Sequence, residues 1–452
     1  MLFIPRILKD IARIFSAHGT PCFLVGGAVR DMLRGEKAQD FDLATAARPD
    51  AVTAMFSAER CTVIPTGIKH GTVTVHYKGQ AFEITTFRTE SDYRDGRHPE
   101  KVAYAATIED DLSRRDFTMN AMALELPQGR LIDPFNGRAD IQNRVIRCVG
   151  NPLERFSEDG LRSLRCVRFA SQFGFSVDTE TLAAIPQTLS ITASVSVERI
   201  RDELDKVIGS AKPSTGLLLM ERTGLLEQML PELAACRGVE QKGRHRFDVL
   251  DHSLLACDYA AKERCPRAVR LAALFHDIGK RATRAMDESG VWTFYHHERE
   301  SAVLTKNILS RLRYPNAVID TVTHLVDEHM FRYTANWSNA AVRRFIVRVG
   351  EAHLPNLYKL RRADAFAHAD EPLRPDFLIP FMDRVTAILN EKKALSLKDL
   401  AVSGKELIAL GIQPGPRLGV ILKELLEAVL DDPELNTKEK LLEIAAKMEG
   451  RT

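Results

Sequence analysis

The sequence predicts an α+β protein in which a β-rich N-terminal part precedes an all-helical remainder. Residues 71–77 and 81–87 are β-branched runs on either side of Lys78-Gly79-Gln80, which is the pattern of a β-hairpin. From about residue 141 the composition becomes helical and stays so to the end. With 452 residues, the chain has room for about two to four domains, each with its own core.

The composition excludes several classes of protein. Hydrophobic residues make up 45% and charged residues 27%, as in ordinary globular proteins. The net charge of +2 is nearly neutral, so any nucleic-acid binding must come from clusters of arginine and lysine. Seven cysteines without a Cys-x-x-Cys pair favour a reducing cytoplasm. No apolar run approaches the ~20 residues of a membrane span, and residues 7–15 have the spacing of a packing helix.

A predicted strand, glycine turn and helix at residues 23–33 form the first candidate binding element. Phe23-Leu24-Val25 indicates a short buried strand, and Gly26-Gly27 allows a tight turn. Residues 28–33 are good helix formers. The free N–H groups at the start of such a helix suit a phosphate.

The next segment carries two carboxylates. Residues 39–43 alternate polar and apolar, which predicts a strand with Asp40 and Asp42 on one face. Neighbouring carboxylates repel unless a cation lies between them, and Mg²⁺ binds one or two carboxylates together with substrate phosphates. The alternative is an edge strand with two solvated aspartates; the phosphate-binding turn upstream favours the metal.

These two segments resemble a known signature. Gly26-Gly27-x-x-Arg30-Asp31 followed by Asp40-x-Asp42 is similar to the nucleotidyltransferase motif of bacterial class II tRNA CCA-adding enzymes and their poly(A) polymerase relatives. The resemblance implies a polymerase-β-like head with a mixed sheet, then an all-α neck, body and tail. It places these parts at residues 1–146, 147–209, 210–390 and 391–452.

Further residues of the head match the same family. Glu83 lies mid-strand, where the family has its third acidic residue, although a solvent-facing charge is the alternative. Residues 112–124 predict a helix that carries Arg114, Arg115, Asp116 and Asn120 in the family pattern Arg-Arg-Asp-x-x-x-Asn-Ala. Two such arginines can hold a triphosphate. Residues 88–111 predict a long exposed loop, which in similar enzymes reshapes the site for the final adenosine.

Residues 158–170 predict one helix with Asp159, Arg162, Arg165 and Arg168 in a stripe. The rest of this helix is apolar, so the stripe should face a cleft; an ion-paired surface is the alternative. An aspartate that only accepts hydrogen bonds, beside an arginine that only donates, complements adenine and cytosine and rejects uracil and guanine. The resemblance implies that Asp159 and Arg162 select the base. Residues 197–204 match a buttressing motif, for which we predict ion pairs with this helix.

The helical body carries a second constellation. His252, the pair His276-Asp277 and Asp364 resemble the HD phosphohydrolase motif, with His297 and His329 in the same part of the chain. Imidazoles and carboxylates bind divalent metals and can activate water, so we predict a second divalent-metal site here. In some similar enzymes this domain removes phosphates from tRNA ends, and in others it only holds RNA. Both remain open.

Candidate contacts to a tRNA backbone are the basic clusters at residues 242–246, 343–344 and 361–362. A glycine turn at residues 410–416 opens a helix and is a further phosphate-binding candidate.

Taken together, the residues and the resemblance predict template-independent addition or repair of the 3′-terminal CCA of tRNA from CTP and ATP, in the cytoplasm, without membrane or DNA. Asp40, Asp42 and Glu83 would be catalytic, with Mg²⁺ on Asp40 and Asp42. The predicted nucleotide-binding residues are Gly26, Gly27, Arg30, Arg114, Arg115, Asn120, Asp159, Arg162, Arg165 and Arg168.

Three alternatives remain. The first is a poly(A) polymerase or an enzyme that adds only the terminal A, although residues 66–75 resemble the CCA-adding members. The second is a metal-dependent HD phosphohydrolase acting on RNA ends. The third is a non-enzymatic RNA-binding scaffold, which the acidic residues of the head disfavour because they would repel RNA. The sequence does not give the oligomeric state.

Overall fold

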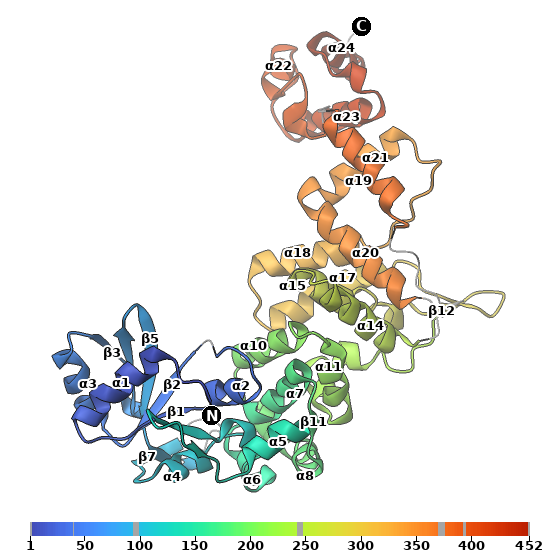
Figure 1. Cartoon of the computed structure of the whole chain (residues 1–452). Coiled ribbons are helices and arrows are strands. Elements are labelled where there is room, and N and C mark those ends of the chain that lie inside the picture. Colours follow the sequence, from blue (N-terminus) through green and yellow to red (C-terminus); the bar gives the residue numbers. More distant parts are fainter. Residues whose placement is uncertain are drawn as a thin grey trace. The chain divides into compact units, whose positions relative to one another are not determined.

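The computed structural model describes residues 2–38, 40–93, 99–241, 247–368, 376–391 and 395–450. The chain divides into two compact units (Figure 1). Unit 1 comprises Met1–Ala234 and Arg311–Arg313, and unit 2 comprises Ala235–Ser310 and Tyr314–Thr452. The α+β class predicted from the sequence is confirmed, because the mixed sheet belongs to unit 1 and the rest is largely helical. No helix in the described part is both long and apolar enough to cross a membrane.

Unit 1 is organised around a seven-stranded sheet with the order β3-β4-β5-β2-β1-β8-β9. The strands are β1 (Cys22–Val25), β2 (Asp42–Thr45), β3 (Thr62–Gly67), β4 (Thr72–Tyr77), β5 (Gln80–Thr86), β8 (Ala123–Leu126) and β9 (Leu131–Ile132). β2 and β5 pair in parallel and the other neighbours are antiparallel. The predicted first strand and the predicted hairpin are therefore both present.

Helices cover both faces of this sheet. α1 (Arg6–Ala17) packs against β1, β8 and α3 (Pro49–Ala58), with Phe15 and Phe56 in edge-to-face contact. On the opposite face, Phe23 and Val25 of β1 join a core with α4 (Ile108–Ser113). This division follows from the period-2 alternation of side chains along a strand. The short helix α2 (Gly27–Leu33) leaves the end of β1, and α5 (Gly137–Asn143) packs against α2.

Two predictions for the head are wrong. The segment expected to be a long loop contains the antiparallel pair β6 (Arg88–Tyr93) and β7 (Pro99–Tyr104) and then α4; its centre, residues 94–98, lies outside the described residues. The helix expected at 112–124 ends with α4, and the chain continues through a 3₁₀ turn, η2 (Thr118–Asn120), into β8. Phe117 is extended there and forms a β-bridge with Cys148, so a long-range pairing overrides local helix propensity.

Among the remaining helices of unit 1, α7 (Leu161–Phe173) packs against α10 (Val197–Ile208) and α11 (Pro213–Arg222). The others are α6 (Pro152–Glu158), α8 (Thr179–Ala184), α9 (Leu189–Ala193), α12 (Leu225–Met229) and α13 (Pro231–Ala234), with a small parallel pair β10 (Val145–Ile146) and β11 (Ser176–Val177).

The prediction of a single helix over residues 158–170 is also wrong, because the chain breaks there between α6 and α7. Asp159 is extended (φ −142°, ψ 108°) between α6 and α7, so it does not lie on the helix that carries the arginines. Gly160 packs against the backbone of Ile191, where a Cβ would come within 2.6 Å of the carbonyl. This close approach of another segment fixes the break.

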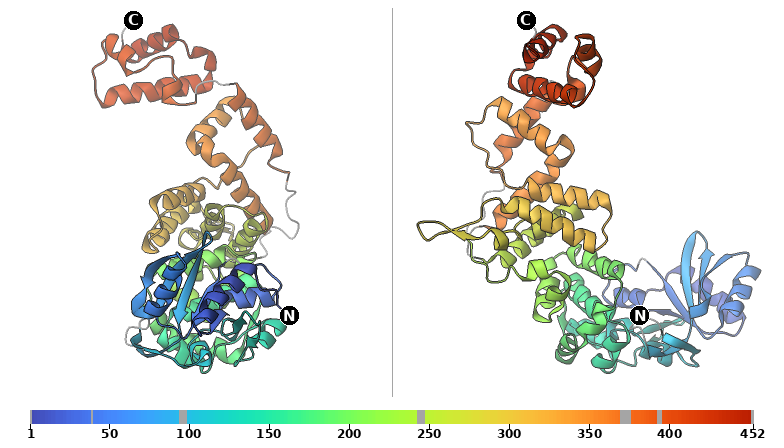
Figure 2. Two further views of the ribbon diagram at one scale, coloured as in Figure 1. Left: turned by 60° about the vertical axis from the view of Figure 1, so that its left-hand side comes forward. Right: turned by 180° about the vertical axis from the view of Figure 1, so that it is seen from behind.

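Unit 2 is helical and has two cores. α14 (Val249–Lys262), α15 (Arg267–Phe275), α18 (Asn316–Asp327) and α20 (Leu354–Ala367) pack together. α16 (Lys280–Thr283), the pair β12 (Ala285–Met286) and β13 (Trp292–Thr293), α17 (His297–Arg311), α19 (Asn339–Val349) and α21 (Ile379–Asn390) complete this part. The C-terminal helices α22 (Gly404–Ala409), α23 (Pro416–Asp431) and α24 (Lys438–Met448) are grouped at the end of the chain (Figure 2). They enclose a separate apolar cluster.

Short 3₁₀ helices complete the described secondary structure. Besides η2 they are η1 (Ile68–His70), η3 (Pro186–Thr188), η4 (Glu351–His353), η5 (Leu397–Asp399) and η6 (Pro433–Leu435).

Candidate active site

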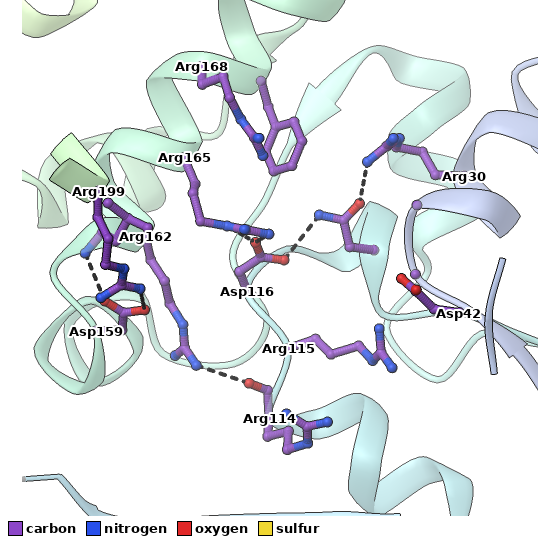
Figure 3. A pocket seen from close by; sticks show the side chains of 15 residues that line it. Arg30, Asp42, Arg114, Arg115, Asp116, Asp159, Arg162, Arg165, Arg168 and Arg199 are labelled. Carbon is purple, nitrogen blue, oxygen red and sulfur yellow. Dashed lines mark hydrogen bonds and ion pairs between the residues drawn. The ribbon is translucent and has the colours of Figure 1, made fainter. Parts of the chain in front are cut away.

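A cavity of about 470 Å³ in unit 1 brings the head residues and α7 together (Figure 3). Its lining is strongly basic but contains three aspartates. The charged residues around it are Arg30, Asp42, Arg114, Arg115, Asp116, Asp159, Arg162, Arg165, Arg168 and Arg199. Every predicted nucleotide-binding residue lines this cavity. Such a size and such a set of arginines suit a phosphorylated small molecule.

The glycine turn forms one wall. Gly26 has φ +70°, a conformation that favours glycine, and a Cβ there would lie 3.0 Å from a guanidinium nitrogen of Arg115. It would also lie 4.0 Å from Oδ2 of Asp42. A side chain at Gly26 would therefore enter the space between the arginine and the carboxylate, so glycine keeps that space open.

The acidic residues come from neighbouring strands. Asp42 begins β2 and lies opposite Glu83 of β5 in parallel register, so both side chains project from the same face of the sheet. The strand predicted over residues 39–43 is wrong, because β2 begins only at Asp42. Asp40 therefore precedes the strand instead of sharing a strand face with Asp42, and Gln39 lies outside the described residues. Burial, the charge of Glu83 and the charge of Asp40 raise the pKa of Asp42, while Arg115 opposes them. A divalent cation would relieve this repulsion, so the donor set fits Mg²⁺.

Asp111 orients the arginine pair of the head. Its Oδ1 accepts hydrogen bonds from Arg114 at 3.0 and 2.9 Å, and its Oδ2 accepts one from Arg115 at 3.1 Å. Asp111 is buried, which by itself raises its pKa, but the two arginines lower the pKa below its usual value. Arg114 and Arg115, in the turn after α4, are therefore both oriented by the ionised carboxylate of Asp111.

Asp116 belongs to the family pattern that the sequence matches, but the pattern gave it no role; in the structure it connects the head to α7. Its carboxylate accepts hydrogen bonds from Nε of Arg165 (2.7 Å), Nδ2 of Asn120 (3.0 Å) and the backbone of Phe117 (2.8 Å). Asn120 in turn accepts one from Arg30 at 2.8 Å. Burial would raise the pKa of Asp116, but Arg165 and these hydrogen bonds lower it to about 2. Arg165 is distant from Asp116 in sequence, so this contact could not be predicted from the sequence pattern alone.

The residues predicted to inspect the base lie on the far side of the cavity. Asp159 accepts hydrogen bonds from the backbone of Leu161 and from Arg199, each at 3.0 Å. Arg162 donates to Glu158 at 2.5 Å and to the backbone carbonyl of Arg114 at 3.1 Å. Each is thus oriented by its own partners before any nucleotide binds.

Residues of α10 support this side of the cavity, as predicted. Glu203 lies 3.0 Å from Arg168, and Arg199 holds Asp159. Burial lowers the pKa of Arg168 to about 10, against the charge of Glu203, and its guanidinium lies over the ring of Phe169 at 4.0 Å. The predicted ion-pair network is therefore confirmed. Arg199 itself was not predicted to line the cavity.

In unit 2, the four residues of the HD motif come together and are buried. Nε2 of His252 and Nε2 of His276 lie 3.3 and 3.4 Å from Oδ2 of Asp277, and 3.3 and 3.5 Å from Oδ1 of Asp364. Burial lowers the pKa of His252 despite the nearby carboxylates, whereas at His276 burial is outweighed by Asp277 and Asp364, which raise its pKa. Lys280 and Arg361 balance the charge of the two carboxylates.

Not all of the predicted basic clusters are available to RNA. Arg343 is buried and donates to the carbonyls of Leu430 and Asp431, so the hypothesis of a surface cluster there is wrong. Arg361 is engaged with Asp364. Residues 242–246 lie outside the described residues.

Three family models match the chain. The poly A polymerase head domain covers residues 22–147, the probable RNA and SrmB-binding site of polymerase A covers 174–237, and the putative domain 2 of tRNA nucleotidyltransferase covers 284–445.

Individual proteins are similar as well. A CCA-adding enzyme of Geobacillus stearothermophilus is 43% identical over 267 residues, 59% of this chain, so the chain spans only 61% of that relative's length. An A-adding tRNA nucleotidyltransferase of Deinococcus radiodurans is 35% identical over 419 residues, 90% of each chain. The crystal structure of a Bacillus stearothermophilus CCA-adding enzyme in complex with CTP matches with a TM-score of 0.75 and 30% identity, over 99% of this chain and 98% of that one.

Proposed function

Because the chain belongs to the tRNA nucleotidyltransferase/poly(A) polymerase family, we propose that it is an enzyme that adds nucleotides from CTP and ATP to the 3′ end of tRNA without a nucleic-acid template. The observation that carries this proposal is the single cavity in which the carboxylate of Asp42 faces a ring of arginines and the Asp159–Arg162 pair. Relatives named as CCA-adding enzymes, and structures of such enzymes with CTP, ATP and tRNA, support it.

The head residues would bind and orient the reacting groups. Asp40, Asp42 and Glu83 would hold Mg²⁺, since their negative charges crowd together. Mg²⁺ bound there would supply positive charge for the transferred phosphoryl group and acidify the 3′-hydroxyl of tRNA. Arg114 and Arg115 would bind the triphosphate in the orientation that Asp111 imposes. Phosphoryl transfer depends mostly on such positioning and charge neutralisation.

Asp159 and Arg162 would select the base. The carboxylate of Asp159 keeps lone pairs beyond those used by Leu161 and Arg199, so it can still accept from an exocyclic amino group. Uracil would present a carbonyl to this carboxylate and leave it unsatisfied, at a cost of about 1–3 kcal/mol.

Incorporation assays on defined tRNAs test this proposal. A tRNA that lacks CCA should accept two C and one A when CTP and ATP are both present, and only C when CTP is alone. A second candidate, an enzyme that adds only the final A, is favoured by the similarity to the Deinococcus radiodurans protein. Addition of A only to a tRNA that already ends in CC would establish that candidate, and a long A tract would indicate a poly(A) polymerase.

We also propose that His252, His276, Asp277 and Asp364 bind a divalent cation. Four buried donors with spacings of 3.3 to 3.5 Å support this proposal. Hydrolysis of phosphates at RNA ends by this site would be tested with His276→Gln and Asp42→Asn variants assayed in parallel. Loss of phosphate release in the first variant only would separate the two activities.

A cytoplasmic location is part of the proposal. All seven cysteines are free thiols, and most of them are buried, which suits a reducing compartment.

A further inference from the structure

We propose that Phe169 of α7 is a positioning residue for nucleotide binding, because its ring orders three arginines of the cavity, Arg30, Arg165 and Arg168. This inference rests on the proposed nucleotide addition. It goes beyond it by giving a role to an uncharged residue, which acts on the ligand only through the arginines that it orients.

Phe169 lies where three guanidinium groups converge. The centre of its ring lies 4.0 Å from Cζ of Arg168, 5.5 Å from Cζ of Arg30 and 5.6 Å from Cζ of Arg165. All four residues line the same cavity. Arg165 and Arg168 extend from α7, whereas Arg30 comes from α2 (Figure 3). A cation within about 6 Å of the centre of a phenyl ring is attracted by the negative charge of the ring face. The ring therefore attracts cations from both the head and α7.

Two other rings hold Phe169 in place. Phe117 meets it edge to face, with 5.7 Å between the ring centres and 88° between the planes. Phe173 stacks on it, with 5.5 Å between the centres and 12° between the planes. Phe169 is only 4% exposed. A ring enclosed in this way has a fixed plane, so it presents the arginines with a fixed surface.

Arg168 depends on this ring for its orientation. Its Nε lies 3.0 Å from Oε2 of Glu203, but neither atom has a hydrogen bond of acceptable geometry. The ion pair therefore supplies attraction without a fixed direction. The contact with Phe169 at 4.0 Å is the one that sets the plane of this guanidinium.

The ring also covers a part of the cations that the acidic residues leave open. Burial, the largest cause, lowers the pKa of Arg168 to about 10; the charges of Arg165 and Arg30 act in the same direction, and Glu203 opposes them. The three cations therefore repel one another inside the cavity. Carboxylates bind the edges of a guanidinium, where its N–H groups point, and leave its faces uncovered. An aromatic ring covers a face and carries no net charge, so it adds nothing that would repel a triphosphate.

The same contacts argue against stacking of Phe169 on a base. Arg168 lies over the ring, Phe173 is stacked on it, and little of the ring is exposed. In the proposed function the base is selected by Asp159 and Arg162. A ring that acts through the other arginines should therefore strengthen the binding of CTP and of ATP by the same factor.

Fluorinated phenylalanines at position 169 of the full chain test the proposal. Mono-, di- and trifluorophenylalanine withdraw charge from the ring face step by step, while the ring keeps nearly the same size. Dissociation constants for CTP and ATP are measured by calorimetry with Mg²⁺ and without tRNA. We expect both to rise with each fluorine, by about 10-fold at trifluorophenylalanine, which corresponds to about 1.4 kcal/mol. In nucleotide addition, KM should rise by a similar factor while kcat is unchanged, as expected for a contact made equally before and in the transition state.

Phe156 provides the matched control. It is buried in unit 1, as Phe169 is, and no cation in the described part of the chain lies over its ring. The same three substitutions there should leave both dissociation constants unchanged. Phe169→Leu removes the aromatic face altogether and should weaken the binding of both nucleotides at least as much as trifluorophenylalanine does. If that variant fails to fold, the fluorinated series still decides, because fluorine preserves the packing; thermal unfolding of each protein checks this.

The possible results differ in what they reject. Dissociation constants that stay constant across the series at position 169, or that rise equally at position 156, would overturn the role of the ring. So would weaker binding of only one nucleotide, because the ring would then act on the base. Failure of the unsubstituted chain to bind CTP and ATP would reject the proposed function together with this inference. A constant series in a chain that binds and adds both nucleotides would reject this inference alone.

Discussion

Replacing Asp116 with asparagine tests whether its charge holds the head and α7 together. The substitution keeps the size of the side chain and an acceptor for the backbone of Phe117. It places a neutral amide against Arg165, which lies 2.5 to 2.7 Å away. The pKa of Asp116 falls from 3.8 to about 2. Each pKa unit corresponds to about 1.4 kcal/mol, so its contacts favour the charged form by about 2 kcal/mol.

The stabilisation of about 2 kcal/mol inferred for the Asp116 carboxylate lies below the ~3–5 kcal/mol expected when one partner of a fully buried ion pair is removed. Asp116 is 8% exposed, but the side chain of Arg165 is 35% exposed and can regain water. We therefore expect Asp116→Asn to destabilise unit 1 by about 2 kcal/mol. The pKa is lowered on folding, so this stabilisation is present above pH ~4 and is lost as the pH falls toward 2.

Hydrogen exchange in α7 measures the effect, because both tryptophans, Trp292 and Trp337, belong to unit 2 and do not report on unit 1. A loss of 2 kcal/mol should speed exchange of the protected amides about 30-fold at pH 7. Asp202→Asn is the matched control, since that carboxylate is 56% exposed. Unchanged exchange in Asp116→Asn would refute the reasoning. So would a difference from the wild type that stays constant between pH 5 and pH 2.5, because packing rather than charge would then explain it.

Three further predictions address the chemistry and the fold. Asp42→Asn should lower nucleotide addition by about 100-fold or more while tRNA binding, measured by filter retention, is unchanged; retained addition would contradict a role in holding Mg²⁺. Asp159→Asn should reduce the preference for CTP over UTP, measured as a ratio of kcat/KM, by about 10- to 100-fold, because an amide can donate as well as accept. Gly160→Ala should destabilise unit 1 by about 3 kcal/mol or more, since its Cβ would meet the backbone of Ile191 at 2.6 Å. Gly419→Ala is the contrasting variant, because the space around Gly419 is open and alanine favours a helix. It should raise the stability of unit 2 in thermal unfolding.

Three elements of the head have causes within a short stretch of sequence and were predicted correctly. They are the buried strand at residues 23–25, the β-branched hairpin and the glycine turn. The parallel register that places Glu83 opposite Asp42 is not a local property. The sequence indicated only that Glu83 lay in a strand, and the resemblance to the family supplied its partner.

Two long helices were predicted where the chain breaks. In both places the local residues favour a helix, and the interruption depends on a distant segment. Phe117 is drawn into a bridge with Cys148, and Gly160 packs against the backbone of Ile191. Neither partner can be identified from one sequence, since propensity counts only neighbours along the chain. The break moves Asp159 off the helix of Arg162, yet both residues still line the cavity.

The contacts of the arginines explain how so basic a cavity can exist in a chain whose net charge is +2. Each of these arginines has an anionic partner within the protein: Asp31 for Arg30, Asp111 for Arg114 and Arg115, Glu158 for Arg162, Asp116 for Arg165, Glu203 for Arg168 and Asp159 for Arg199. These acids reduce the repulsion among the guanidinium groups and hold their side chains in place before a ligand arrives. A ligand then loses less affinity to the ordering of side chains, which costs about 0.5–1.5 kcal/mol for each long side chain immobilised. The acidic partners therefore belong to the proposed site together with the arginines, and a search that counts only basic residues would overlook them.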